Sequence, residues 1–371
     1  MFHLLISLPC LIVILRVLAP LAWPLWSKVV LSAMLLLVSQ HHLLTQLAFG
    51  SMFSPEVPPA VVLLVNTLFG AMLFLALMQL AVDALTLVLA LIKRRRLIIP
   101  AALRYALSLV ALAVATFAVS QAARVPLLKE VDITIDGLPE AFEGYQIVHL
   151  TDLHISRLFQ ASWVEDVVEK TNALGADVIL ITGDLIDGTL EARRDDVAPL
   201  ASLTAPDGVF ASSGNHEYYF DASEWMAHYQ TLGMRTLSNE HVVIERGDAA
   251  LVLAGVNDAS AAEHGYPGPD VTEALEGAPP GAPVILLDHQ PRNARRAAGQ
   301  GVDLQLSGHT HGGMMVGFDR LVARANEGFV SGLYALDGMT LYLNSGTALW
   351  PGFALRLGKP SELTRITLHA R

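Results

Sequence analysis

Gly308-His309-Thr310-His311-Gly312-Gly313 is the stretch from which the rest of the chain can be interpreted. It follows an apolar, strand-like run, Val302–Ser307. The two histidines are two positions apart, so they leave the end of an extended strand on the same side, and the flanking glycines allow a sharp turn. Neutral imidazole is the commonest metal ligand in proteins. Taken alone, the stretch fits two metal-coordinating positions and a turn with two incidental histidines equally well.

Four further strand-like runs upstream end in the same kinds of residue, which favours the metal-site interpretation. The polar residues at the five junctions are Asp152 and His154, Asp184 and Asp187, Asn215 and His216, His289, and His309 and His311. Because ligands collect at the carboxyl ends of strands in α/β folds, these side chains are expected to converge on one point. Two or three carboxylates, one amide and up to five imidazoles suit two metal ions about 3.5–4 Å apart better than one tetrahedral ion. The mixture favours two divalent ions of Mn, Zn or Fe over Ca²⁺ or Mg²⁺.

Charge and hydropathy are distributed unevenly along the 371 residues. The mean hydropathy is +0.47, and the apolar excess is concentrated before about residue 124. The remainder, Val125–Arg371, holds 33 of the 35 acidic residues and 16 of the 24 basic ones, a formal charge of −17. Such a surface repels polyanions and argues against nucleic acid as a partner. Cys10 is the only cysteine, so the chain has neither an intramolecular disulfide nor a thiolate zinc site.

The first 124 residues are predicted to form a bundle of about four transmembrane helices. Spanning a bilayer takes about 20 mostly apolar residues, and four stretches are long enough: Phe2–Trp23, Val29–Phe49, Ala60–Ile92 and Leu97–Ala122. Gln40, His41 and His42 interrupt the second stretch, and we expect them to lie near the headgroups or to face other helices rather than to form a proton or metal site.

The basic cluster Lys93-Arg94-Arg95-Arg96 indicates the orientation in the membrane. It lies between the third and fourth stretches, and the positive-inside rule places it in the cytoplasm. The fourth helix would then carry the chain outward. The sequence therefore predicts a multi-pass protein of the cell (inner or plasma) membrane, with residues 125–371 outside the cytoplasm.

Residues 125–371 are expected to form one α/β domain. The predicted strands are Val131–Asp136 at an edge, Tyr145–Leu150, Asp177–Thr182, Gly208–Ser212, His241–Glu245, Leu251–Gly255, Val284–Leu287, Val302–Ser307, Met339–Leu343 and Leu363–Leu368. Strands alternate with helices in the first half of this region, and the second half is richer in strands. This order indicates a layered α/β sandwich.

The order of these motifs resembles that of the calcineurin-like metallophosphoesterase superfamily. The matching motifs are Asp152-x-His154, Gly183-Asp184-x-x-Asp187, Gly214-Asn215-His216-Glu217, His289 and Gly308-His309-x-His311. Three later segments resemble its membrane-associated bacterial branch, the YkuE/YaeI-like phosphohydrolases: Ser331-Gly332-Leu333-Tyr334, Met339-Thr340-Leu341-Tyr342 and Leu357–Leu363. The resemblance covers about Val131–Arg371.

The resemblance implies a four-layer α-β-β-α sandwich with a dinuclear metal site. Asp152, His154 and His311 would bind one metal, Asn215, His289 and His309 the other, and Asp184 would bridge them. His216 would remain unligated near the leaving group, as a proton donor or a charge stabiliser, and Asp187 would orient it. A hydroxide held between the two cations would attack the phosphorus in line. Asp288 departs from the small polar residue that relatives often carry, and it is expected to add negative charge near the second metal.

A membrane-anchored, metal-dependent phosphoesterase acting on a phosphodiester or phosphomonoester is therefore the function that the sequence favours. A lipid-linked or cell-envelope substrate is an inference from location alone, and nothing indicates an oligomeric state. One alternative is a lipid enzyme similar to the UDP-diacylglucosamine pyrophosphatases, which would need a cytoplasmic domain. The other is a non-catalytic membrane sensor or scaffold that retains metal, and the intact pair of His216 and Asp187 speaks against it.

Six other residues receive structural interpretations. His149 is expected to be a core histidine or a support for the site. Arg157 and Arg356 are expected to face solvent rather than to steer a phosphate. Phe159 and Phe353, like Trp350, would either wall the mouth of the site or pack within loops.

Overall fold

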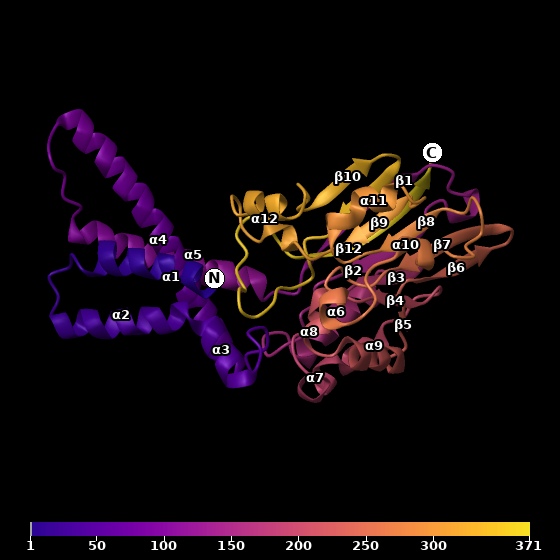
Figure 1. Ribbon diagram of the computed structural model, residues 1–371, viewed down its shortest axis with the longest axis horizontal. Helices are drawn as coiled ribbons and strands as arrows, with labels where there is room; N and C mark the ends of the chain where they lie inside the picture. The colour runs from indigo at the N-terminus through magenta and orange to yellow at the C-terminus, as the bar shows by residue number, and fades with distance from the viewer. Residues whose placement is uncertain (1) are drawn as a thin grey trace. The chain divides into compact units, whose positions relative to one another are not determined.

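The computed structural model describes residues 2–371, which fall into two compact units (Figure 1). The helical unit comprises Met1–Ala122 together with Pro351–Leu355. The sheet unit comprises Ala123–Trp350 and Arg356–Arg371. A short segment late in the chain therefore belongs to the helical unit, far in sequence from the helices around it.

Two helices of the helical unit are long and apolar enough to cross a membrane. They are α4 (Pro59–Lys93) and α5 (Ala101–Ala122), which agree with the third and fourth predicted stretches. A stripe of small side chains on α5, Ala111, Ala115 and Ala118, is buried, and Gly70 of α4 lies close enough for an added Cβ to be 3.3 Å from the Cβ of Ala115. Small residues of this kind allow close helix packing in membranes.

The first two predicted stretches are not continuous long helices, so the prediction of four such spans holds only in part. The second is divided into α2 (Leu25–Ser39) and α3 (His41–Phe49), which are bent by 62° around Gln40 and could count as one span only together. The first is a shorter apolar helix, α1 (Phe2–Ile12), continued by the π-helical turn η1 (Val13–Leu18).

The sheet unit contains two six-stranded mixed sheets. The first has the order β1-β12-β2-β3-β4-β5, from β1 (Leu127–Ile135), β2 (Gln146–Leu150), β3 (Val178–Thr182), β4 (Val209–Ser212), β5 (Arg235–Thr236) and β12 (Glu362–Ala370). The second has the order β10-β11-β9-β8-β7-β6, from β6 (Glu240–Arg246), β7 (Ala249–Gly255), β8 (Val284–Leu287), β9 (Leu304–Ser307), β10 (Gly332–Leu336) and β11 (Met339–Leu343). Strands β2 to β5 run parallel, as do β7, β8, β9 and β11.

The two sheets share one hydrophobic core. Ile147 and Leu180 of the first sheet lie in the same buried cluster as Leu253, Ile285 and Leu304 of the second. Because side chains alternate along a strand, the neighbouring residues point to the opposite faces. On the outer face of the second sheet, strand residues pack with Ala274 of α10 (Val271–Ala274) and with Ala294 and Ala297 of α11 (Ala294–Ala298).

Helices connect the parallel strands of the first sheet, as parallel pairing requires. The remaining α-helices are α6 (Ala161–Asn172), α7 (Leu190–Val197), α8 (Asn215–Tyr219), α9 (Ala222–Thr231) and α12 (Asp319–Ala325). The 3-10 helices are η2 (Glu140–Phe142), η3 (Ala198–Ser202), η4 (Ala261–His264), η5 (Pro291–Asn293) and η6 (His311–Gly313). The polar residues singled out from the sequence lie in the loops that follow five of these strands: β2, β3, β4, β8 and β9.

Candidate metal centre

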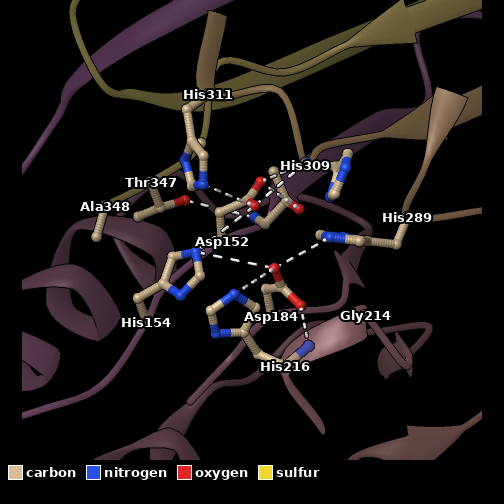
Figure 2. Close-up of polar contacts among 12 residues, drawn as sticks. Asp152, His154, Asp184, Gly214, His216, His289, His309, His311, Thr347 and Ala348 are labelled. Atoms are coloured by element: carbon tan, nitrogen blue, oxygen red, sulfur yellow. Dashed lines mark hydrogen bonds and ion pairs between the residues drawn. The ribbon is translucent and has the colours of Figure 1, made fainter. Parts of the chain in front are cut away.

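The loops after five parallel strands carry the polar cluster of the sheet unit (Figure 2). Asp152 and His154 follow β2, Asp184 follows β3, and His216 follows β4. His289 follows β8, and His309 and His311 follow β9. Backbone hydrogen bonds hold neighbouring loops together, from the N–H of Asp152 to the carbonyl of Gly183 at 3.0 Å and from the N–H of Gly308 to the carbonyl of His289 at 3.0 Å. The five predicted junctions therefore do lie together.

Three groups of side chains in this cluster could each hold a metal ion, since their ligand atoms lie within 4.8 Å of one another. They are Asp152, His154 and His311; His154, Asp184 and His216; and Asp184, His289 and His309. Asp184 is shared by two groups, and its Oδ2 is 3.1 Å from Nε2 of His289 and 3.8 Å from Nε2 of His154. Oδ1 of Asn215 lies 3.0 Å from Nδ1 of His309.

The hydrogen bonding of the ring nitrogens fits a metal. Among residues 2–371, Nε2 of His154 and Nε2 of His289 are buried and make no hydrogen bond. A buried polar atom left unsatisfied costs about 1–3 kcal/mol, so two such atoms within one cluster indicate a compensating ligand. Divalent cations among the carboxylates and imidazoles would satisfy both.

Asp187 orients two of the imidazoles. Its Oδ2 accepts a hydrogen bond from Nδ1 of His154 at 3.1 Å, and its Oδ1 accepts a short one from Nδ1 of His216. Nδ1 of His289 is held in the same way, since it donates to the carbonyl of Thr182 at 2.7 Å. With Nδ1 committed to these hydrogen bonds, Nε2 is the nitrogen of His154 and of His289 that can bind a metal beside Asp184. A carboxylate or carbonyl partner of this kind also increases ligand basicity.

The charges of the cluster shift the pKa values of its carboxylates and imidazoles. Burial alone would raise the pKa of Asp152, but the neighbouring His311 and His154 outweigh burial and lower it. Burial alone would lower the pKa of His154, but Asp187 and Asp152 outweigh it and raise this pKa to about 10. Burial lowers the pKa of His311 to about 3, so this ring is neutral at physiological pH. The carboxylates are ionised, as metal ligands must be.

Strained backbone accompanies the cluster. Asp152, His154, Asp184, His309 and His311 all have positive φ, between 44° and 71°. Non-glycine residues adopt this region at an energetic cost and keep it only where surrounding contacts enforce it, commonly at functional sites.

Glu217 enforces part of this conformation, and the sequence analysis assigned it no role. Its buried carboxylate accepts hydrogen bonds from the N–H groups of Gly214 at 2.7 Å, Leu185 at 2.8 Å and Asp184 at 3.0 Å. Glu217 therefore fixes the loops after β3 and β4 relative to each other. The sequence did offer a signal for this role, because Glu217 is an acidic residue directly after the candidate site residues Asn215 and His216.

Arg356 is buried, so the expectation that it faces solvent was wrong. Its guanidinium donates to the carbonyl oxygens of His311 at 3.1 Å, Ser345 at 2.6 Å and Ala348 at 3.1 Å. Burial lowers the pKa of Arg356 to about 10, which leaves it charged at neutral pH. Arg356 thus holds the loop of a candidate ligand through backbone carbonyls.

Three other residues singled out from the sequence, His149, Phe159 and Asp288, are buried. His149 is buried and its Nε2 lies 2.9 Å from Oγ1 of Thr182, as expected of a core histidine beside the site. Phe159 is buried against Trp163 rather than at a mouth. Burial and the nearby Asp258 raise the pKa of Asp288 to about 8, which opposes the negative charge expected of this carboxyl.

A cavity of about 270 Å³ opens on the cluster. Asp184, Asn215, His216, His309 and His311 line one part of it. Trp350 lines it too, together with Met314, Val322 and Asn326. Of the three aromatic residues weighed as walls of the site, Trp350 is therefore the one found there.

Comparison with known proteins gives the same family as these motifs. The model of the calcineurin-like phosphoesterase family matches residues 145–313. An uncharacterized metallophosphoesterase of Campylobacter jejuni is 33% identical over 300 residues, which cover 79% of this chain and 78% of the relative. The uncharacterized metallophosphoesterase YkuE of Bacillus subtilis is 29% identical over 63% of this chain and 82% of its own length.

A longer relative in cattle, a transmembrane protein with metallophosphoesterase domain, is 37% identical over 261 residues. The match covers 67% of this chain but only 58% of that protein. The likeness to the Campylobacter protein extends over most of both sequences. The chain belongs to the calcineurin-like metallophosphoesterase family.

Proposed function

We propose that this protein is a membrane-anchored, metal-dependent phosphoesterase that hydrolyses a phosphodiester or a phosphomonoester. The observation that carries the proposal is the convergence of five strand-end loops on one buried cluster of carboxylates and imidazoles. Family membership supports the same chemistry.

In this proposal two divalent ions, of Mn, Fe or Zn, occupy the cluster. Asp152, His154 and His311 hold one ion, Asn215, His289 and His309 hold the other, and Asp184 lies between them. Bound there, the ions would activate a water molecule and neutralise the charge of the phosphate oxygens.

His216 and Asp187 have a separate role. His216 lines the cavity, and its Nδ1 donates to the buried carboxylate of Asp187, so its Nε2 is directed towards the cluster. A proton at Nε2 can be passed to the oxygen of the leaving group, a contribution of about 10²–10⁴ to the rate. Asp187 fixes the ring for that transfer.

We also propose the finer architecture and location expected from the sequence. Residues 1–124 would form a transmembrane helical region of about four spans, and residues 125–371 a four-layer α-β-β-α domain outside the cytoplasm. Two long apolar helices and the membrane protein among the relatives support a membrane location. An alkaline phosphatase fusion after Ala123 should be active. A silent fusion would reverse the topology and favour the UDP-diacylglucosamine pyrophosphatase-like alternative.

The test of activity is hydrolysis by the full chain in detergent of bis-p-nitrophenyl phosphate and of p-nitrophenyl phosphate. Each would be measured with added Mn²⁺, Zn²⁺ or Mg²⁺ or with EDTA, and Asp184→Asn is the control variant. Metal-dependent turnover that disappears in the variant is the expected result, and the ratio of the two rates separates diester from monoester chemistry. Two bound metals per chain without turnover on either ester would favour the non-catalytic alternative.

A further inference from the structure

The segment Pro351–Leu355 is held inside the helical unit by buried polar side chains. Asn66 of α4 donates from Nδ2 to the carbonyl of Pro351 at 2.7 Å, and its Oδ1 accepts the N–H of Ala354 at 2.7 Å. Nε2 of His41 and Nε2 of His42 lie 2.9 and 2.8 Å from the carbonyl of Gly352. The backbone of the segment is therefore satisfied by side chains of α3 and α4, as an apolar environment requires.

Apolar contacts close the remaining sides of the segment. The rings of Phe353 and Phe69 pack edge to face with centroids 5.7 Å apart. A Cβ added at Gly70 would lie 2.8 Å from Cδ2 of Leu355, so glycine is needed there for the close approach. The segment is a fixed part of the helical unit.

A cavity of about 340 Å³ lies beside this segment, within the helical unit. Pro351 and Gly352 form part of its lining. Leu37, Leu44 and Phe49 line it as well and are between 42% and 58% exposed, so the cavity opens on the outer surface of the helices. Cavities of this size accommodate small-molecule ligands.

The lining favours a hydrocarbon occupant. The polar groups of His41 and Asn66 that reach the cavity already hydrogen bond to the segment and to the carbonyls of Val38 and Val62, respectively. Its rim continues into exposed apolar side chains of the same helices, including Leu47 at 75% and Leu64 at 56%. If these helices lie in a bilayer, as the proposed function requires, the medium at the rim is lipid.

We propose that this cavity binds an acyl chain of a membrane lipid, and that the bound chain, packed against Pro351 and Gly352, controls hydrolysis at the metal centre. The connection is covalent. Trp350, the residue before the segment, lines the metal-site cavity, and Arg356, the residue after it, donates to the carbonyl of His311. A displacement of the segment would act on both residues through the backbone. The inference rests on the proposed membrane location and extends the proposed function to a lipid-responsive enzyme.

The test uses the full chain in phosphatidylcholine vesicles that contain a small fraction of lipid with a diazirine near the end of one acyl chain. After illumination, the labelled peptides are mapped. Val65→Trp fills the cavity from α4, and Leu64→Trp, on the adjacent exposed position outside the lining, is its matched control. Ala48→Phe with Leu47→Phe as control repeats the comparison on α3 if Val65→Trp does not fold.

We expect labelling of α3 and α4 to fall about tenfold in the two cavity-filling variants and to stay unchanged in the controls, because each methylene excluded from an apolar site weakens binding about fourfold. Unlabelled lipid should compete, whereas its deacylated headgroup should not. Equal labelling of Val65→Trp and Leu64→Trp would overturn the proposed lipid site.

Hydrolysis of bis-p-nitrophenyl phosphate and of p-nitrophenyl phosphate is measured on the same samples with and without added lipid. The wild type and the controls should respond to lipid, and the cavity-filling variants should not. Loss of labelling with an unchanged response would overturn the control of hydrolysis. Specific labelling without hydrolysis in any sample would overturn the proposed phosphoesterase while supporting the lipid site, so the two failures are distinguishable.

Discussion

Replacing Asp187 by Asn should weaken metal binding and leaving-group protonation together. The carboxylate is fully buried, accepts from Nδ1 of His154 at 3.1 Å through Oδ2, and accepts from Nδ1 of His216 through Oδ1. Asn keeps the size of the side chain but offers one acceptor oxygen and no charge. At least one of the two rings must then turn or change its tautomer.

The expected magnitudes follow from these two hydrogen bonds. A hydrogen bond to a charged group contributes about 1.5–3 kcal/mol, and loss of a supporting contact to a metal-bound histidine typically costs about 10–100-fold in metal affinity. Through His154, Asp187→Asn should therefore lower metal affinity about 10–100-fold. His216→Ala removes only the proton donor, so it should lower the rate at saturating metal by about 10²–10⁴ and leave metal affinity unchanged.

The assay combines metal titration by calorimetry with hydrolysis of an alkyl and an activated aryl ester. The rate of hydrolysis of the alkyl ester should fall more than that of the aryl ester in both variants, because its leaving oxygen must be protonated. Unchanged metal affinity in Asp187→Asn would refute the orienting role of this carboxylate. Equal loss of metal in His216→Ala and Asp187→Asn would make His216 a ligand, consistent with its Nε2 lying 3.9 Å from Oδ2 of Asp184.

Three further predictions concern the surroundings of the site. Gly308→Ala should abolish metal binding, measured by metal content after gel filtration, because its Cβ would overlap Oδ2 of Asp152; Gly299→Ala, whose nearest neighbour would be 3.5 Å away, should bind normally. Arg356→Met should destabilise the protein by about 2–4 kcal/mol, seen as a lower thermal denaturation midpoint, since buried carbonyls lose their donor. Burial lowers the pKa of His149 to about 3, so between pH 6.5 and 3 the unfolded chain binds a proton at this residue and the folded chain does not. The free energy of unfolding therefore falls as the pH falls through this range. In His149→Gln, denaturation measured across the same range should show a smaller fall in this free energy.

Most strands, including those that carry the candidate ligands, could be predicted because their signals are local. Val284–Leu287 and Met339–Leu343 have the predicted boundaries, and the prediction of Val131–Asp136 as an edge strand is confirmed by the position of β1. Each is a short apolar run that ends in turn-forming or polar residues, so neighbouring residues alone define it. The convergence of their loops followed from the general behaviour of parallel strands.

Pairing between distant segments could not be predicted in this way. β10 was missed because Gly332–Leu336 forms a strand through its antiparallel partner β11 rather than through its own composition. β12, the last strand, lies between β1 and β2, an order that the local sequence does not encode. The burial of Arg356 has the same origin, since its carbonyl partners come together only in the folded loops.

The place of Pro351–Leu355 in the helical unit could have been suspected from polar residues of the first helices. A Pro-Gly stretch such as Pro351-Gly352 is typical of an exposed loop, yet its carbonyls are bound by residues 285 to 311 positions away. The informative residues were His41, His42 and Asn66, polar side chains within apolar helices. Such residues need partners, and helix backbones are already satisfied internally, so the partners were to be sought in a segment without regular structure. Here that segment joins Trp350 to Arg356, and the proposed lipid control of hydrolysis depends on this connection.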